Sequence, residues 1–265
     1  MVDINYALQT HDVSSWQGIE RYAGSKTEVV RKCVSSFFHS VEFAAKQRPE
    51  SNHIIKIFDD HSTEETLEFL NRCMKRFDKE NVSVFIEHLD KKGIMSSIRS
   101  CYEWMEFSGK DLVMQVQDDY LFTETAIFEI IDVFMQLRQD VQSDAIVASF
   151  HDHRYWKTIY RYKVTPRVIF PGAYQNWMQI YDIPCTFLTS KEQFSKHWDL
   201  YDIFFNTDLN NTVGDLENKS LNKMFTERGV LGVQPFTSVA LHMQDEYWKD
   251  PYIDWRKRWN SVEVI

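Results

Sequence analysis

The 265-residue chain has little cysteine, glycine or proline, and it contains no long apolar run. Its four cysteines are widely spaced without a CxxC pair, which argues against disulfides and against a zinc site. Without a repeat, a low-complexity tract or a Pro/Gly linker, the chain is expected to form one continuous domain. The missing apolar run indicates neither a signal peptide nor a membrane span. We therefore expect a cytoplasmic protein with reduced thiols.

Positive charge is also in deficit, with 30 basic residues against 39 acidic ones and a net charge of −9. A dedicated nucleic-acid binder usually carries a basic field, so no nucleic-acid partner is expected. A local basic pocket for an anionic cofactor remains compatible with this balance. Hydrophobic content of 43% and aromatic content of 15% describe a globular chain with a substantial core.

Apolar strand-like runs alternate with segments of helical periodicity along the first 150 residues. The pattern predicts an α/β fold with a mainly parallel central sheet, right-handed crossovers and flanking helices. The expected strands cover residues 5–10, 54–58, 82–86, 112–117 and 145–150. In the second half, Ser190 with Gln193 predicts the start of a short helix, and Ser62 with Glu65 predicts the start of an earlier one.

Three of the expected strands end in polar residues: Thr10-His11-Asp12, Asp59-Asp60-His61-Ser62 and Gln117-Asp118-Asp119. In a parallel sheet these ends meet at one edge, where open α/β sheets bind ligands. Hard oxygen donors of this kind suit Mg²⁺ or Mn²⁺ held against substrate phosphates. The alternative is that adjacent aspartates only open a turn or face a helix N-terminus, where the dipole favours anions.

The ordered motifs in the first half of the chain resemble the GT-A glycosyltransferases, most closely those of family 2. The resemblance rests on a first strand ending in Thr10, an apolar strand ending in Asp59-Asp60-x-Ser62, a loop with Lys92-Gly93 followed by Arg99, and a strand ending in Gln117-Asp118-Asp119. It implies a GT-A-like domain over residues 1–245, with a Rossmann-like nucleotide-sugar-binding half (1–122) and an acceptor half (123–245). Residues 246–265 then form an aromatic C-terminal segment.

The resemblance implies that a sugar passes from a UDP- or GDP-sugar to a carbohydrate or other hydroxyl acceptor, with inversion and with Mn²⁺ or Mg²⁺. It assigns the nucleoside to Thr10, Asp12 and Asp59, and the base or diphosphate to Lys92 and Arg99. Asp118 is expected near the ribose or metal, and Asp119 and His242 are expected to hold the cation. Gln117 replaces the usual first carboxylate of the metal motif, which lowers the expected metal affinity or leaves the metal on Asp119 and the diphosphate. The alternative for Lys92 and Arg99 is that both are solvated surface charges, and the alternative for His242 is a purely structural role.

The second half supplies two candidates for the general base, Glu217 and, with a weaker claim, Asp215. A carboxylate is needed there to take the proton of the acceptor hydroxyl as its oxygen attacks the anomeric carbon. Two acids in a first helical turn are explained equally well by the helix dipole.

Aromatic residues in the second half have two interpretations. Four of them either form a platform on which a sugar ring stacks or belong to the ordinary core: Trp156, Tyr174, Trp177 and Tyr181. Trp248, Tyr252, Trp255 and Trp259 recur at helical spacing, which predicts a short C-terminal helix that packs on the domain or borders the acceptor cleft.

Two other functions remain open from the sequence. A sugar-1-phosphate nucleotidyltransferase has a related sheet, but such enzymes usually carry a Gly-rich loop after the first strand, where this chain has Gly18 alone before position 24. A catalytically silent nucleotide-sugar or carbohydrate-binding protein is compatible with the incomplete metal motif.

Overall fold

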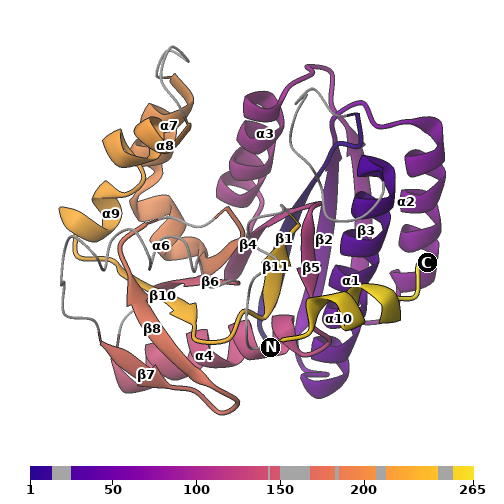
Figure 1. Cartoon of the computed structure of the whole chain (residues 1–265). Coiled ribbons are helices and arrows are strands. Elements are labelled where there is room, and N and C mark those ends of the chain that lie inside the picture. The colour runs from indigo at the N-terminus through magenta and orange to yellow at the C-terminus, as the bar shows by residue number, and fades with distance from the viewer. Residues whose placement is uncertain (14–24, 143, 150–167, 183–184, 207–212, 244–252) are drawn as a thin grey trace.

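The computed structural model describes residues 1–13, 25–142, 144–149, 168–182, 185–206, 213–243 and 253–265, and only the backbone at 213–215. In these ranges a nine-stranded sheet has the order β3-β2-β1-β4-β9-β6-β10-β8-β7 (Figure 1). Its strands are β1 (Asp3–Thr10), β2 (Asn52–Asp59), β3 (Val82–His88), β4 (Leu112–Gln117), β6 (Ala145–Ala148), β7 (Ile169–Pro171), β8 (Asn176–Ile180), β9 (Phe187–Ser190) and β10 (Leu231–Pro235).

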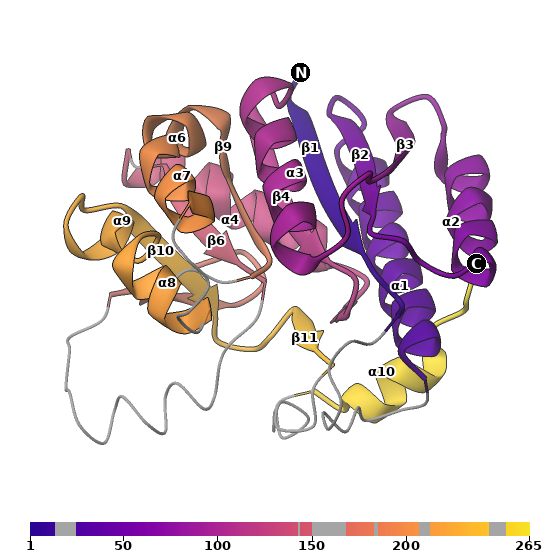
Figure 2. The ribbon, with the colours of Figure 1, turned by 90° about the horizontal axis from the view of Figure 1, so that it is seen from above.

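The sheet is mainly parallel because only β8 and β9 run against the other strands. Strand β9 lies antiparallel between β4 and β6, and thereby separates the regular α/β half from the rest of the sheet. Helices cover both faces, as the view from above shows (Figure 2). They are α1 (Lys26–Gln47), α2 (Glu64–Phe77), α3 (Ile94–Phe107), α4 (Ala126–Asp140), α6 (Lys191–Lys196), α7 (Trp198–Asn206), α8 (Val213–Lys219), α9 (Lys223–Thr226) and α10 (Trp255–Ser261).

Two apolar cores follow from the alternation of side chains along the strands. Ile4, Tyr6 and Leu8 of β1 face α1, α2 and α4, whereas Ala7 faces the opposite core with α3 and α6 to α9. Both faces of β1 are therefore buried, as expected for a central strand of a parallel sheet. Helix α1 runs for 22 residues and begins at the cap residue Ser25, whose side chain accepts a hydrogen bond from the N–H of Glu28.

Parallel pairing brings the carboxyl ends of β1, β2 and β4 together. Thr10 is in register with Asp59, and Gln9 with Gln117. The convergence predicted from the strand ends is confirmed, because a single register fixes all three ends on one edge of the sheet.

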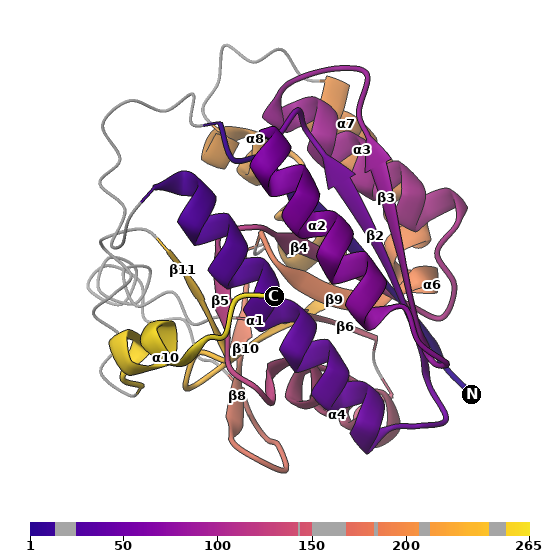
Figure 3. The same cartoon turned by 90° about the vertical axis from the view of Figure 1, so that its right-hand side faces the viewer.

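A second, two-stranded sheet stands beside this edge. It consists of β5 (Tyr120–Phe122), which follows directly after Asp118 and Asp119, and the antiparallel β11 (Ala240–His242). Helix α10 packs against α1 beside this pair, as the side view shows (Figure 3). The described residues include no helix that is long and apolar enough to cross a membrane.

The fold class predicted from the sequence is confirmed, with one local difference at the start of α2. Ser190 caps α6 as expected, by accepting a hydrogen bond from the N–H of Gln193. The expected start of α2 at Ser62 with Glu65 is wrong: the cap residue is Thr63, and its own side chain makes no capping bond.

Candidate active site

Asp118 is tied to two segments that precede it by about ninety residues or more. One oxygen, Oδ2, accepts a hydrogen bond from the backbone N–H of His11 at 2.6 Å. The other, Oδ1, lies 2.7 Å from Nζ of Lys26, the first residue of α1. Burial raises the pKa of Asp118, while the Lys26 ammonium acts in the opposite direction. The carboxylate therefore joins the ends of β1 and β4 to the start of α1.

Lys26 is the site residue that the sequence interpretation missed. Its side chain is only 10% exposed, and its ammonium also lies 3.9 Å from Oδ2 of Asp119. Nothing in the local sequence marks it, because a lysine in a first helical turn looks like a solvated charge. Only the pairing of β1 with β4 and the packing of α1 beside them show that Lys26 lies next to an acidic pair.

Asp119 meets His242 through the pairing of β5 with β11. His242 is in register with Tyr120, and its Nε2 lies 3.3 Å from Oδ2 of Asp119. The backbone carbonyl of Asp119 accepts a hydrogen bond from the N–H of Met243, which fixes the turn. The structure thus brings together two residues that lie 123 positions apart and that the sequence interpretation assigned to one metal.

The donor atoms of this pair suit a divalent cation. A carboxylate oxygen and an imidazole nitrogen are both acceptable ligands of Mn²⁺, and a spacing of 3.3 Å allows both to face one ion. In the part of the chain that the structure describes, no three His, Cys, Asp or Glu side chains are grouped to hold a metal. Most ligands of a cation here would therefore come from the substrate and water.

The ends of β1 and β2 hold a second pair of buried carboxylates. Asp59 accepts hydrogen bonds from the hydroxyl of Thr10 at 3.5 Å and the N–H of Ser62 at 3.3 Å. Its other oxygen lies 3.3 Å from Nδ1 of His88. Since Thr10 is fully buried, it positions Asp59 instead of facing a ligand itself.

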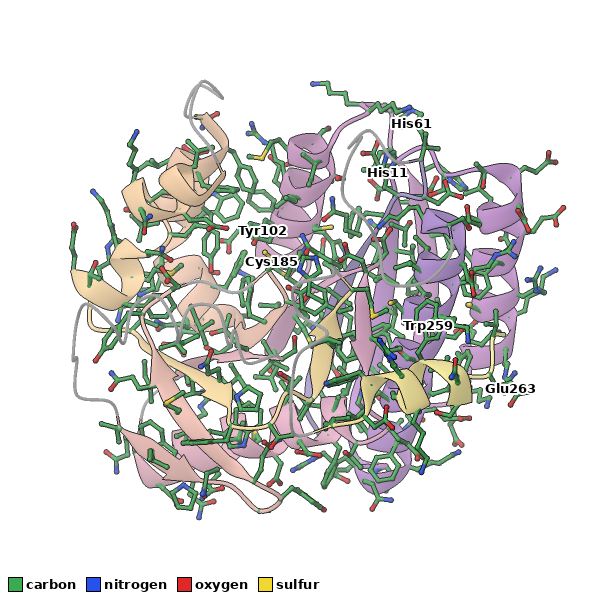
Figure 4. All side chains as sticks on the ribbon, in the orientation of Figure 1. His11, His61, Tyr102, Cys185, Trp259 and Glu263 are labelled. Atoms are coloured by element: carbon green, nitrogen blue, oxygen red, sulfur yellow. The ribbon has the colours of Figure 1, made fainter. Side chains whose placement is uncertain are left out.

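Asp60 holds the loop before α3. Both of its oxygens accept the backbone N–H of Gly93, at 3.1 and 3.0 Å. Gly93 has φ of 123°, a conformation that side chains other than hydrogen strongly disfavour. His11 and His61 contact Asp60 through its carbonyl and its carboxylate, respectively, and both stand at the upper end of these strands (Figure 4).

Asp12 binds the start of α2 in the structure, whereas the resemblance implies that it contacts the nucleoside. Its carboxylate accepts the N–H of Thr63 at 2.9 Å and the hydroxyls of Thr63 and Thr66. Burial opposes ionisation of Asp12, but these hydrogen bonds outweigh it and lower the pKa. Asp12 therefore supplies the N-terminal cap that α2 does not provide for itself.

The two basic residues expected near the diphosphate lie outside this cluster of contacts. Arg99 donates from Nε to Glu103 at 2.8 Å on the same face of α3, and its side chain is 45% exposed. Lys92 is exposed in the loop before α3. These positions agree with the interpretation of both as solvated charges.

Glu217 is half-buried on α8, and burial raises its pKa to about 7, with the charge of Asp182 adding to the effect. Asp182 itself accepts a hydrogen bond from the side-chain amide of Asn222 at 2.6 Å. A carboxyl group with this pKa exchanges protons near neutral pH, which suits a general base. The side chain of Asp215 lies outside the described residues.

The thiol of Cys185 is influenced by carboxylates from both halves of the chain. The residue is exposed to solvent while protein surrounds much of it: burial raises the pKa of its thiol to about 12, and the charges of Glu217 and Asp119 add to this. Tyr102 lies beside Cys185 (Figure 4), and Glu217 also contributes to raising the pKa of Tyr102. The two halves of the chain therefore contribute carboxylates to one region.

The described residues divide the candidates for the aromatic platform. Trp177 is buried in the core. Tyr174 is 61% exposed and packs edge-on against Phe128, with ring centroids 5.6 Å apart. Trp156 lies outside the described residues.

Comparison with known proteins supports the fold. No model of a known protein family matches the sequence, and no curated protein sequence matches it. Among solved structures, an apo UDP-glucose pyrophosphorylase is similar over 97% of this chain and 100% of its own, with a TM-score of 0.53 and 9% identity. A mannosyltransferase from Pyrobaculum calidifontis, in complex with GDP-Man and Mn²⁺, is similar over 96% of this chain and 60% of its own, with a TM-score of 0.53 and 12% identity. The chain has the α/β fold of the GT-A type, with a mainly parallel central sheet flanked by helices.

Proposed function

We propose that the protein is a metal-dependent glycosyltransferase that moves a sugar from a UDP- or GDP-sugar to a hydroxyl of a carbohydrate or other acceptor, with inversion at the anomeric carbon. The observation that carries the proposal is the contact of Asp119 with His242, whose Oδ2 and Nε2, respectively, lie 3.3 Å apart at the carboxyl edge of the sheet. The raised pKa of Glu217, about 7, adds a carboxyl group that can accept a proton near neutral pH. An inverting transferase needs a proton acceptor together with a cation site for the leaving diphosphate.

In the proposed reaction, Glu217 accepts the proton of the acceptor hydroxyl while that oxygen forms a bond to the anomeric carbon. The bond between this carbon and the donor diphosphate breaks, and the nucleoside diphosphate leaves with the electron pair. Asp119 and His242 are the residues that would hold Mn²⁺ or Mg²⁺, which supplies Lewis-acid neutralisation of charge on the leaving group. Asp59, held by Thr10 and Ser62, is proposed to face the nucleoside.

The second candidate is a sugar-1-phosphate nucleotidyltransferase. It is favoured by the similarity to the UDP-glucose pyrophosphorylase, which extends over the whole of that chain. A nucleotidyl transfer uses an anionic phosphate as nucleophile and needs no base for a hydroxyl, so it gives no role to a carboxyl group poised at about pH 7. We therefore place it second, and the silent binding protein third.

Product analysis separates the three functions. The protein is screened for thermal stabilisation by UDP, GDP and their sugars with Mn²⁺, because a ligand that binds the folded state raises its melting temperature. The stabilising donor is then incubated with a panel of saccharide acceptors. A glycosyltransferase releases the nucleoside diphosphate and forms a glycoside. A nucleotidyltransferase instead forms a nucleoside triphosphate when pyrophosphate is added, and a silent binder forms neither product.

Glu217→Gln tests the proposed base. The amide cannot accept the proton, so transfer should fall by roughly 10²–10⁴-fold while donor affinity is retained. Glu227→Gln is the matched control, because Glu227 is an exposed acid at the end of α9. Transfer at the wild-type rate in Glu217→Gln would assign the base to another residue, with Asp215 as the first candidate.

A further inference from the structure

Lys26 occupies a place that the proposed reaction does not yet use. It is the first residue of α1, and Ser25 fixes the start of this helix by capping it. Its ammonium is 2.7 Å from one oxygen of Asp118 and 3.9 Å from one of Asp119. Because the second oxygen of Asp118 is held by the backbone of His11 at 2.6 Å, the carboxylate is anchored and in turn holds the ammonium near Asp119.

The charge balance shows what such an ammonium would do. Asp118 and Asp119 with Lys26 carry a net charge of −1, and a divalent cation changes this to +1. Without Lys26, the two carboxylates would carry −2, and the same cation would leave the centre neutral. A diphosphate is attracted by a positive centre, and interactions between charges this deeply buried are screened little by salt.

We propose that Lys26 is a diphosphate-binding residue that shifts the selectivity of the acidic pair from the bare cation to the cation with its diphosphate. This inference rests on the proposed function, which places a nucleoside diphosphate at Asp119. An oxygen of a diphosphate bound to the same cation as Asp119 comes within reach of the ammonium, and lysine acts on phosphates as a compact point charge. The same ammonium repels a cation that arrives alone.

The proposal predicts opposite changes in two affinities when the charge of Lys26 is removed. Mn²⁺ binding without nucleotide is measured by electron paramagnetic resonance, and binding of UDP and GDP in saturating Mn²⁺ is measured by calorimetry. In Lys26→Met we expect Mn²⁺ alone to bind roughly 3–10-fold more tightly and the nucleoside diphosphate at least about 10-fold more weakly, in line with charge-assisted contacts. Lys26→Arg keeps the charge and should shift both affinities less.

A double variant isolates the charge from the structural contact. Lys26→Met with Asp118→Asn removes the whole buried ion pair and restores a net charge of −1 before the cation binds. Mn²⁺ affinity should therefore return to about the wild-type value, while nucleoside diphosphate binding stays weak. This variant leaves no unpaired buried charge, so it also provides a folded protein if Lys26→Met is unstable.

Three results overturn the inference. Unchanged diphosphate affinity in the folded Lys26→Met or double variant excludes Lys26 as a phosphate ligand. A parallel fall of both affinities shows that Lys26 only supports Asp118. Wild-type protein that binds Mn²⁺ but neither UDP nor GDP removes the proposed function itself, and the inference with it.

Discussion

The imidazole of His242 stacks on the ring of Tyr120, with centroids 4.8 Å apart and planes inclined by 10°. The stacking follows from the register of β5 with β11, and it fixes the plane of the ring whose Nε2 lies 3.3 Å from Asp119. A side chain from near the end of the chain is thus oriented toward a carboxylate from its middle. Orientation by packing is what a metal ligand requires.

His242→Phe should keep the aromatic contact with Tyr120 and remove the nitrogen. We expect the melting temperature to change little and Mn²⁺ affinity to fall by at least about 10-fold, because losing a direct ligand costs no less than losing a residue that supports one. Electron paramagnetic resonance of free Mn²⁺ measures the affinity. His39→Gln, on α1 away from this edge, is the control, and unchanged Mn²⁺ binding in His242→Phe would exclude His242 as a ligand.

The stability of the protein should depend on pH through Glu217. Its pKa is about 7 in the folded protein against an ordinary value of 4.5, so the folded state binds the proton more tightly than the unfolded state. The contribution of Glu217 to the free energy of unfolding is fully present below pH 4.5 and is lost as the pH rises to about 7. Glu217→Gln should therefore be more stable than wild type at pH 8, by up to about 3 kcal/mol, and should show little difference at pH 4.5.

Urea denaturation of both proteins at pH 4.5 and pH 8 measures this difference, because each pair of curves isolates one residue from all other titrating groups. Glu227→Gln should show no such dependence, since Glu227 is exposed. An equal difference between wild type and Glu217→Gln at both pH values would contradict a raised pKa.

Asp12→Ala should destabilise the fold by about 1–3 kcal/mol, because it leaves the start of α2 without its cap and the buried hydroxyl of Thr66 without an acceptor. Chemical denaturation measures the loss, and Asp90→Ala, at an exposed position after β3, is the control. Nucleotide affinity should change little. A selective loss of nucleotide binding at unchanged stability would instead return Asp12 to the nucleoside-binding role that the resemblance implies.

Helix α10 should be required for stability. Trp255 and Trp259 are buried against Cys33 of α1 and Leu241 of β11, so Trp259→Ala should cost about 3–5 kcal/mol. Asn260→Ala, on the exposed side of the same helix, should cost little. Truncation after Gln244 should lower the melting temperature strongly. A truncated protein that melts like the full chain but no longer transfers sugar would support a lid over the acceptor instead of packing.

The sequence determined the strands and helices of the first half of the chain and the placement of Asp59, Asp118 and Asp119 at one sheet edge. Local periodicity specifies these strands and helices, because it depends on neighbours within about one helix length. The shared edge follows from the general rule that parallel strands end on the same side of a sheet.

The tertiary structure alone decided the partners of these carboxylates. Lys26 reaches Asp118 across 92 positions, and His242 reaches Asp119 across 123. The hydrogen bonds from α2 to Asp12 and the raised pKa of Glu217 also result from tertiary packing. A hydrogen bond, an ion pair or the loss of solvent around a carboxyl group depends on which segments pack together, and no spacing along the chain encodes it.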